Sequence, residues 1–276
     1  MTRSTSHRLS APALLLVLLA SGCVAPQVSR PVPKLDTAPA YAVLPPPVPD
    51  EKRFNHMLQP LDDAKLVVYN NNFGGGGAAV GVLFGPLGVA ANIKAIKNAT
   101  TADVALLHGK LPVQPIALFQ DVVQATPDLA PAAGGAPAVR LIPEVLVVKT
   151  KGELLRFGCT LWVDFTPVGT SWGRTYVFQT AFAAPKEQVA QGLAPEQLQQ
   201  LEQELRAGYA ALAAAYLDDL HGKAEPLRDV TFKSEYVTPR IVLDLLGKEL
   251  PGPADRLVVR TARVTYSLPR TNVEVR

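Results

Sequence analysis

The chain has 276 residues, 48% of them hydrophobic, and a formal net charge of +3 at pH 7. Arg3 and Arg8 lie in a predicted export signal that would be removed, so the mature chain would have 25 basic and 24 acidic side chains. This near balance gives no concentrated positive field and argues against nucleic acid as a partner. Cys159 is the only cysteine after Cys23, so no intramolecular disulfide is expected and stability must come from side-chain burial.

Residues 1–22 have the three-part layout of a secretory signal. Arg3 and Arg8 give a positive start, ten residues at 11–20 give an apolar core, and small residues precede Cys23. Ten residues are too few to cross a bilayer as a helix, which needs roughly 20. A cysteine directly after small residues supplies a thiolate that can accept a diacylglyceryl group.

Residues 1–23 therefore resemble the signals of bacterial lipoproteins that are processed by the lipoprotein signal peptidase, although Ala20 stands where that family usually has leucine. The resemblance implies that Cys23 becomes the first residue of the mature chain and carries three acyl chains, palmitate among them. Several acyl chains give a stable membrane anchor. Lipoproteins kept in the inner membrane typically have aspartate after the cysteine, and here Val24 follows. We therefore expect anchoring in the cell outer membrane, facing the periplasm.

Residues 23–60 are crowded with proline and have few large apolar side chains. Such a composition predicts a tether that extends by about 3.1 Å per residue where it is in polyproline conformation. An unstructured segment with no spacing role is the alternative. Residues 61–276 are enough for a single domain with a sizeable core.

The domain is predicted to begin with a strand at 64–69, followed by a glycine-rich apolar segment at 73–91. Gly77, Gly81 and Gly85 recur every fourth residue there, and no charged side chain occurs between residues 66 and 93. On a helix these glycines share one face, as in the glycine zippers of certain envelope proteins, which the segment resembles over some ten residues. The resemblance implies membrane insertion or self-association. Pro86 favours instead a hairpin or helix packed inside the domain.

Apolar spacing predicts the remaining helices and strands. They are, in chain order, a helix over 89–111, a short helix from Pro115, strands at 139–149, 153–165 and 174–182, a long amphipathic helix at 195–220, a strand at 229–237, a short helix at 238–246, and a last strand or hairpin at 257–268. This order predicts an α+β fold with a mainly antiparallel sheet and with the long amphipathic helix and the shorter helices packed on one face.

One predicted strand shows which of its faces is buried. Phe157, Cys159, Leu161, Val163 and Phe165 alternate with polar residues and therefore share one side of the sheet. This alternation predicts that Cys159 is a small core residue and not a reactive thiol.

Residues 169–173 read Gly-Thr-Ser-Trp-Gly, which matches the Gly-x-Ser-x-Gly pattern of serine hydrolases. A nucleophile elbow needs a strand before the serine and a helix after it. Here a strand is predicted to follow, and His221 is the only downstream histidine. We therefore expect a hairpin loop and no catalytic residue, and we keep catalysis by Ser171 as an alternative.

Two groups of surface charges offer further alternatives. An acidic face of the long helix could bind a partner protein, and the basic side of the last strands could bind an anionic ligand or protect the sheet edge. The acidic residues are Glu196, Glu202, Glu204, Asp218 and Asp219, and the basic ones are Arg256, Arg260, Arg263 and Arg270.

No metal-ligand spacing or cofactor motif is recognisable, so we predict no metal and no cofactor. The sequence thus favours a lipid-anchored, non-enzymatic envelope lipoprotein that contacts the membrane through Cys23 and binds an envelope protein or itself. Two alternatives stay open. One is a membrane-inserting oligomer built on residues 66–93, and the other is a serine hydrolase that uses Ser171.

Overall fold

The computed structural model describes residues 30–34, 38–45, 57–71, 76–132, 138–238 and 243–276, and of residues 76–90 it describes the backbone alone. Cys23 therefore lies outside the described residues, as do the surroundings of Gly77, Gly81 and Gly85. Within the described ranges the chain forms a largely antiparallel sheet and four α-helices. The predicted mixture of helix and mainly antiparallel strand is confirmed.

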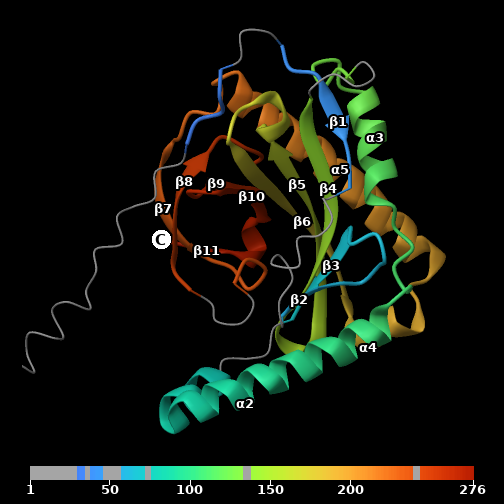
Figure 1. The fold of residues 1–276 in the computed structure, drawn as a ribbon, viewed down its shortest axis with the longest axis vertical. Coiled ribbons are helices and arrows are strands. Elements are labelled where there is room, and N and C mark those ends of the chain that lie inside the picture. The colour runs from blue at the N-terminus through green and yellow to red at the C-terminus, as the bar shows by residue number, and fades with distance from the viewer. Residues whose placement is uncertain (1–29, 35–37, 46–56, 72–75, 133–137, 239–242) are drawn as a thin grey trace, which may run out of the picture.

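The elements follow one another along the chain as shown in Figure 1. The α-helices are α2 (Gly76–Leu107), α3 (Pro115–Gln124), α4 (Lys186–Gln191) and α5 (Pro195–Leu220). The strands are β1 (Tyr41–Val43), β2 (Leu58–Pro60), β3 (Val67–Asn70), β4 (Val139–Lys149), β5 (Leu154–Asp164), β6 (Gly173–Pro185), β7 (Arg228–Lys233), β8 (Leu245–Leu250), β9 (Arg256–Arg260), β10 (Val264–Pro269) and β11 (Glu274–Val275). The strand order is β11-β7-β8-β9-β10-β6-β5-β4-β3-β2, with β1 also paired to β4.

A long meander of β4, β5 and β6 forms the middle of the sheet. β4 and β5 pair from Lys149 opposite Leu155 to Arg140 opposite Asp164. The turn between them contains Gly152 at φ +71°, a left-handed conformation that glycine adopts at little steric cost. The strands predicted at 139–149, 153–165 and 174–182 are confirmed.

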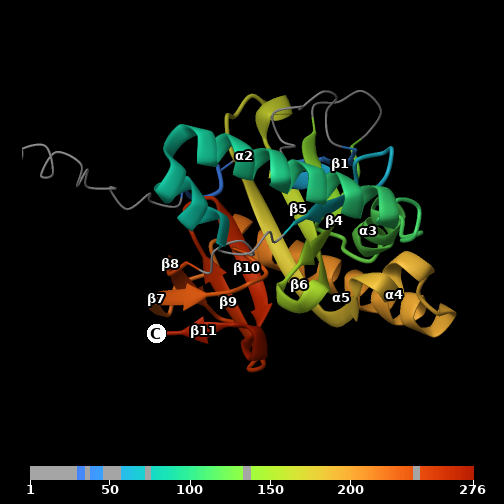
Figure 2. The same cartoon turned by 90° about the horizontal axis from the view of Figure 1, so that it is seen from below.

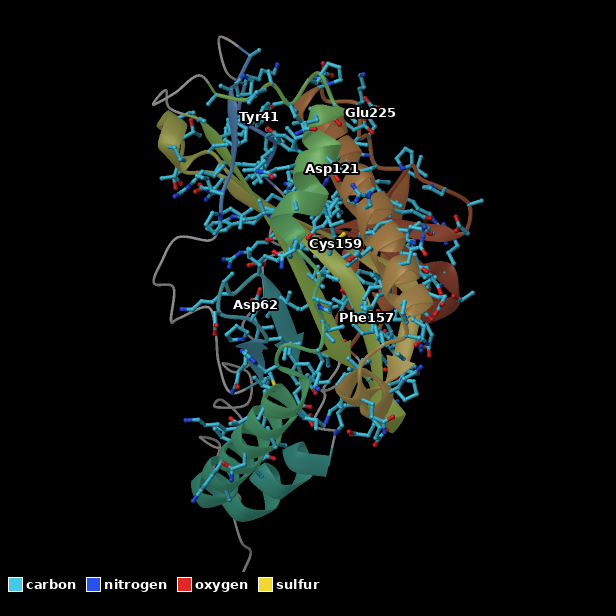
Figure 3. All side chains as sticks on the ribbon, turned by 90° about the vertical axis from the view of Figure 1, so that its right-hand side faces the viewer. Tyr41, Asp62, Asp121, Phe157, Cys159 and Glu225 are labelled. Carbon is cyan, nitrogen blue, oxygen red and sulfur yellow. The ribbon has the colours of Figure 1, made fainter. Side chains whose placement is uncertain are left out.

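One face of this meander is covered by α3 and α5, which lie side by side in Figures 1 and 3. Cys159 is fully buried there, and burial raises the pKa of its thiol, which keeps it protonated. The prediction that Cys159 is a core residue is confirmed. Gly208 of α5 allows the close approach, because a Cβ at this position would lie only 2.7 Å from Cys159 Sγ.

The opposite face is covered by the C-terminal strands, which turn away from β6 in Figures 1 and 2. β10 joins β6 in parallel, with Val264 opposite Thr175. A second apolar cluster fills the space between the two parts of the sheet. It contains Val148, Val177, Val230, Phe232, Tyr236, Leu257, Val259 and Leu268.

The last hairpin is confirmed by β9 and β10, and the strand predicted at 229–237 is confirmed by β7 as far as Lys233, after which residues 235–237 form a turn. The helix predicted at 238–246 is wrong for residues 243–246, because β8 begins at Leu245 and pairs with β7 and β9. Gly247 lies opposite Val230, and a Cβ on it would stand 2.5 Å from a methyl group of Val259. Pairing with the two neighbouring strands therefore overrides the local helix signal.

β1 lies inside the stretch for which composition predicts a tether. Tyr41–Val43 pair in parallel with residues 139–141 of β4, and the Tyr41 hydroxyl lies 3.2 Å from that of Tyr216. The tether prediction is therefore wrong for residues 38–45, and also for residues 58–60, which form β2 and pair with β3. The edge of β4 needs a partner for its backbone N–H and C=O groups, and this segment supplies one.

α2 begins in the glycine-rich segment and continues through the predicted helix at 89–111 as far as Leu107. Ile96 and Leu107 are fully buried, and Asn71 Nδ2 donates a hydrogen bond of 2.9 Å to Thr100 Oγ1. The C-terminal half of the helix is thereby fixed to the end of β3. Among the residues that the structure describes, no helix has both the length and the apolar character to cross a membrane.

A buried carboxylate fixes the same half of α2 to the sheet. Asp103 accepts hydrogen bonds from the Tyr69 hydroxyl at 2.7 Å, from Lys149 Nζ at 2.7 Å and from Lys186 Nζ at 2.9 Å. Glu153 forms ion pairs with both lysines. Burial opposes ionisation of Asp103, but the bonds from Lys149, Lys186 and Tyr69 outweigh it and hold the pKa of the carboxyl below its ordinary value.

Replacing Asp103 by asparagine should lower the free energy of unfolding at pH 7 by about 3 kcal/mol, because two largely buried lysines lose a shared counter-charge. The contribution of Asp103 is complete above the unfolded-state pKa of about 4 and is lost as pH falls through its lower folded-state pKa. The gap between wild type and Asp103→Asn should therefore narrow in acid. Urea titrations at pH 7 and pH 3 measure both effects.

Asp229→Asn is the matched control for this substitution. The Asp229 side chain is 86% exposed beside Lys248, so its neutralisation should change stability by less than about 0.5 kcal/mol. Equal effects of the two substitutions at pH 7 would contradict the assigned role of Asp103.

Candidate functional site

A cavity of about 540 Å³ opens at the end of the β5–β6 hairpin, a volume within the usual range of small-molecule sites. β5 is 11 residues long, so this end lies about 35 Å from the end of β4 at which Lys149 pairs with Asp103 of α2. Figure 1 shows α2 at the other end of the sheet. The cavity is lined by Arg30, Trp162, Ser171, Trp172, Gly173, Arg174, Thr175, Ala262 and Arg263.

The parallel pairing of β10 with β6 assembles this cavity. It brings the turn between β9 and β10 beside the first residues of β6, where Thr175 N–H donates to the Arg263 carbonyl at 3.4 Å. Gly173 leaves room for a ring, because a Cβ on it would lie 3.1 Å from Trp162 Nε1. Segments some 90 residues apart in the chain therefore share one wall.

A buried carboxylate at the end of α5 holds the cationic side of the cavity in place. Asp219 accepts hydrogen bonds from Arg174 at 2.9 Å and from the Tyr176 hydroxyl at 2.8 Å, and it forms an ion pair with Arg260. Its side chain is 3% exposed. Burial and the charge of Asp219 raise the pKa of Tyr176, so this phenol stays a neutral donor. One carboxylate therefore contacts two guanidinium groups and a phenol.

The N-terminal segment closes the cavity from another side. The Arg30 carbonyl accepts a hydrogen bond of 2.6 Å from Arg174 and one of 3.5 Å from Trp172 Nε1. The Arg174 guanidinium lies 5.6 Å from the centre of the Trp172 ring, and Phe165 supports that ring edge-on at 5.1 Å. Trp172 is thus fixed between a cation and the apolar core.

The arrangement is suited to holding an anion. Arg30 and Arg263 are exposed, and neither forms an ion pair within the part of the chain that the structure describes. The residues that line the cavity include no acidic side chain. Guanidinium groups keep their proton at any physiological pH and offer paired N–H donors that match carboxylate and phosphate oxygens.

Comparisons with family models, with curated proteins and with solved structures found no match to this chain. Its interpretation therefore depends on the cavity itself. Ser171 lies exposed at the rim, in the loop between β5 and β6, as the hairpin prediction requires. Among the described residues, no histidine forms a hydrogen bond with Ser171. Within the same ranges, no three His, Cys, Asp or Glu side chains gather to hold a metal ion.

The four arginines predicted to share one basic side separate in the structure. Arg263 lines the cavity, and Arg260 pairs with Asp219. Arg270 pairs with Glu249 at 2.6 Å. Arg256 is stacked 3.7 Å from the centre of the Phe178 ring, and burial lowers its pKa to about 10. The prediction of one common basic side is wrong, because the strands turn between these positions.

The predicted acidic face of the long helix also needs correction. Asp218 and Glu196 are exposed, whereas Asp219 points inward to Arg174 and Arg260. Glu204 is half-buried and accepts a hydrogen bond from the Phe182 N–H. The pattern of charges along a helix does not distinguish a solvated carboxylate from one that meets an arginine of a distant strand.

Three cavity residues carry no functional prediction from sequence. Arg30 falls within the predicted tether. Trp162 lies on the side of β5 that the alternation predicts to be at least partly exposed, and Arg174 lies at the start of a predicted strand. Trp162 and Trp172 are the only tryptophans of the chain, and both line the cavity. Their shared position could have been inferred only by pairing β5 with β6 in the observed register, in which Trp162 faces Thr175.

Asp219→Asn should lower the free energy of unfolding by about 3 kcal/mol, because two largely buried arginines would lose their shared partner. The neighbouring Asp218 is exposed, so Asp218→Asn should change stability by less than about 0.5 kcal/mol. Chemical unfolding of the two variants measures the difference. Equal stabilities would show that Asp219 does not connect α5 to β6 and β9 energetically.

Proposed function

We propose that this chain is a lipid-anchored lipoprotein of the bacterial cell envelope, held in the outer membrane through Cys23 and facing the periplasm, with a non-enzymatic binding role. The signal-like residues 1–23 support the anchor. The observation that carries the binding role is the cavity, which is lined by Arg30 and Arg263, two exposed arginines that have no acidic partner among the described residues. Such groups bind an anion and do not exchange protons with it.

A protein partner would meet a different surface. We propose that α5 is an amphipathic helix whose outward side, with the exposed Glu196 and Asp218, is available to an envelope protein. Its inward side includes the buried residues Leu201, Leu205, Tyr209, Leu212 and Tyr216, which recur at three- and four-residue spacing. The cavity and this surface would allow a small anion and a protein to be bound at separate places.

Metabolic labelling tests the anchor. Cells that express the chain should incorporate a labelled fatty acid into it, and the label and the membrane association should both disappear in Cys23→Ser, because the acylated thiol is the attachment point. Membrane fractionation and mass spectrometry of the mature amino end are the measurements. An unmodified thiol at Cys23 in the wild-type protein would overturn the proposed anchor.

Catalysis by Ser171 is a second candidate, favoured by the position of this exposed serine on the cavity rim. Under the binding proposal, Ser171→Ala should leave any hydrolysis of short-chain esters by the purified protein unchanged within about twofold. Thr170→Ala, in the same loop, is the control. A hydrolytic activity that falls in Ser171→Ala but not in Thr170→Ala would support the hydrolase instead.

The membrane-inserting oligomer built on residues 66–93 remains a separate proposal. β3 and the C-terminal half of α2, from Ile96 to Leu107, are fixed to the sheet, so insertion would have to involve the glycine-rich N-terminal half of that helix. Under this proposal self-association would depend on Gly81, at the centre of the three-glycine repeat.

A further inference from the structure

We infer that the cavity binds the phosphate of an anionic phospholipid headgroup. The inference rests on the proposed anchor at Cys23 and names the ligand of the same cavity. It begins from Arg174, whose position is fixed by Asp219 and by the Arg30 carbonyl. Arg30 and Arg263 also line this cavity, and neither side chain has an acidic partner in the described part of the chain. Several arginines around one cavity match the oxygens of a phosphate group.

The tryptophans indicate that the ligand is not a bare anion. Trp162 and Trp172 contribute large apolar rings to the wall, each with one N–H donor. Indole rings favour the headgroup level of a bilayer, where apolar and polar groups meet. A free phosphate would use the arginines alone, whereas a glycerophospholipid would place its glycerol and first acyl carbons against the rings.

Chain length places the cavity near the source of such a ligand. Arg30 is fixed at the cavity and lies seven residues after Cys23. Seven residues span at most about 25 Å. An acylated Cys23 would therefore hold the cavity close to the membrane surface, within reach of the headgroups.

The two tryptophans also provide the assay, because the intrinsic fluorescence of the chain arises from this cavity. The full-length chain carrying Cys23→Ser, which cannot be acylated at this position, is titrated below micelle concentration with dihexanoylphosphatidylglycerol, with dihexanoylphosphatidylcholine and with inorganic phosphate. We expect the anionic lipid to change the emission and to bind at least about tenfold more tightly than either of the others.

Two charge reversals of equal size separate specific binding from general attraction. Arg263→Glu should weaken binding of the anionic lipid about tenfold or more, whereas Lys97→Glu, on the exposed side of α2 at the far end of the sheet, should change it less than about twofold. Arg30→Ala is a second cavity variant with an expected loss of about tenfold. Circular dichroism confirms that each variant is folded.

The outcomes separate a failure of the proposed ligand from a failure of the proposed anchor at Cys23, on which the ligand rests. No change in emission with any compound, or equal effects of Arg263→Glu and Lys97→Glu, would overturn binding at the cavity even if Cys23 is acylated in cells. Inorganic phosphate binding as tightly as the anionic lipid would assign the cavity to a free anion, and equal binding of both lipids would overturn the anionic headgroup. Selective binding with an unacylated Cys23 would support the ligand and reject the anchor.

Discussion

The carboxylate of Asp219 is the interaction on which the relation between the two parts of the sheet depends. It lies at the end of α5, which covers one face of the meander, and it bonds to Arg174 and Tyr176 of β6 and to Arg260 of β9. Three elements from different parts of the chain therefore meet at one nearly inaccessible acid. An ion pair of this kind adds little net stability but strongly disfavours arrangements in which either partner is left alone. It consequently fixes where β9 and β10 stand against β6, and with them the wall of the cavity.

The two ends of the sheet use charge differently. At the α2 end, Asp103 and Glu153 balance Lys149 and Lys186, so the cluster is neutral and serves to attach a helix. At the cavity end, the described lining residues include three arginines and no carboxylate, and Arg30 and Arg263 are exposed. The charges around Asp103 balance one another, whereas the arginines at the cavity could be balanced by a bound anion.

Local periodicity was sufficient to predict the elements that pair with their neighbours in sequence. The β4–β5–β6 meander, α3 beginning at Pro115 and the burial of Cys159 follow from alternation and helix-start signals. β8 is an exception, because it pairs with its sequence neighbours β7 and β9, whereas the partner of β1 is distant. β1 takes the edge of β4 across almost 100 residues, and β8 enters the sheet where a Thr-Pro pair suggests a helix. No spacing rule within one segment contains that information.

The same limit applies to the candidate site. The Gly-x-Ser-x-Gly motif identifies Ser171 but implies the neighbours of a hydrolase nucleophile. The residues around the rim come instead from the N-terminal segment and from the β9–β10 turn. The sequence groups Arg263 with three other basic residues. Only the parallel pairing of β10 with β6 shows that Arg263 lines the cavity, whereas Arg256 is stacked on Phe178.

The attachment of the N-terminal segment has a mechanical consequence. Tension applied at the amino end would be borne first by the two hydrogen bonds to the Arg30 carbonyl and then by the short strand β1. The β4–β5 hairpin behind them would stay paired until both had yielded. Force on the amino end would therefore distort the tryptophan-lined cavity before the rest of the domain unfolded.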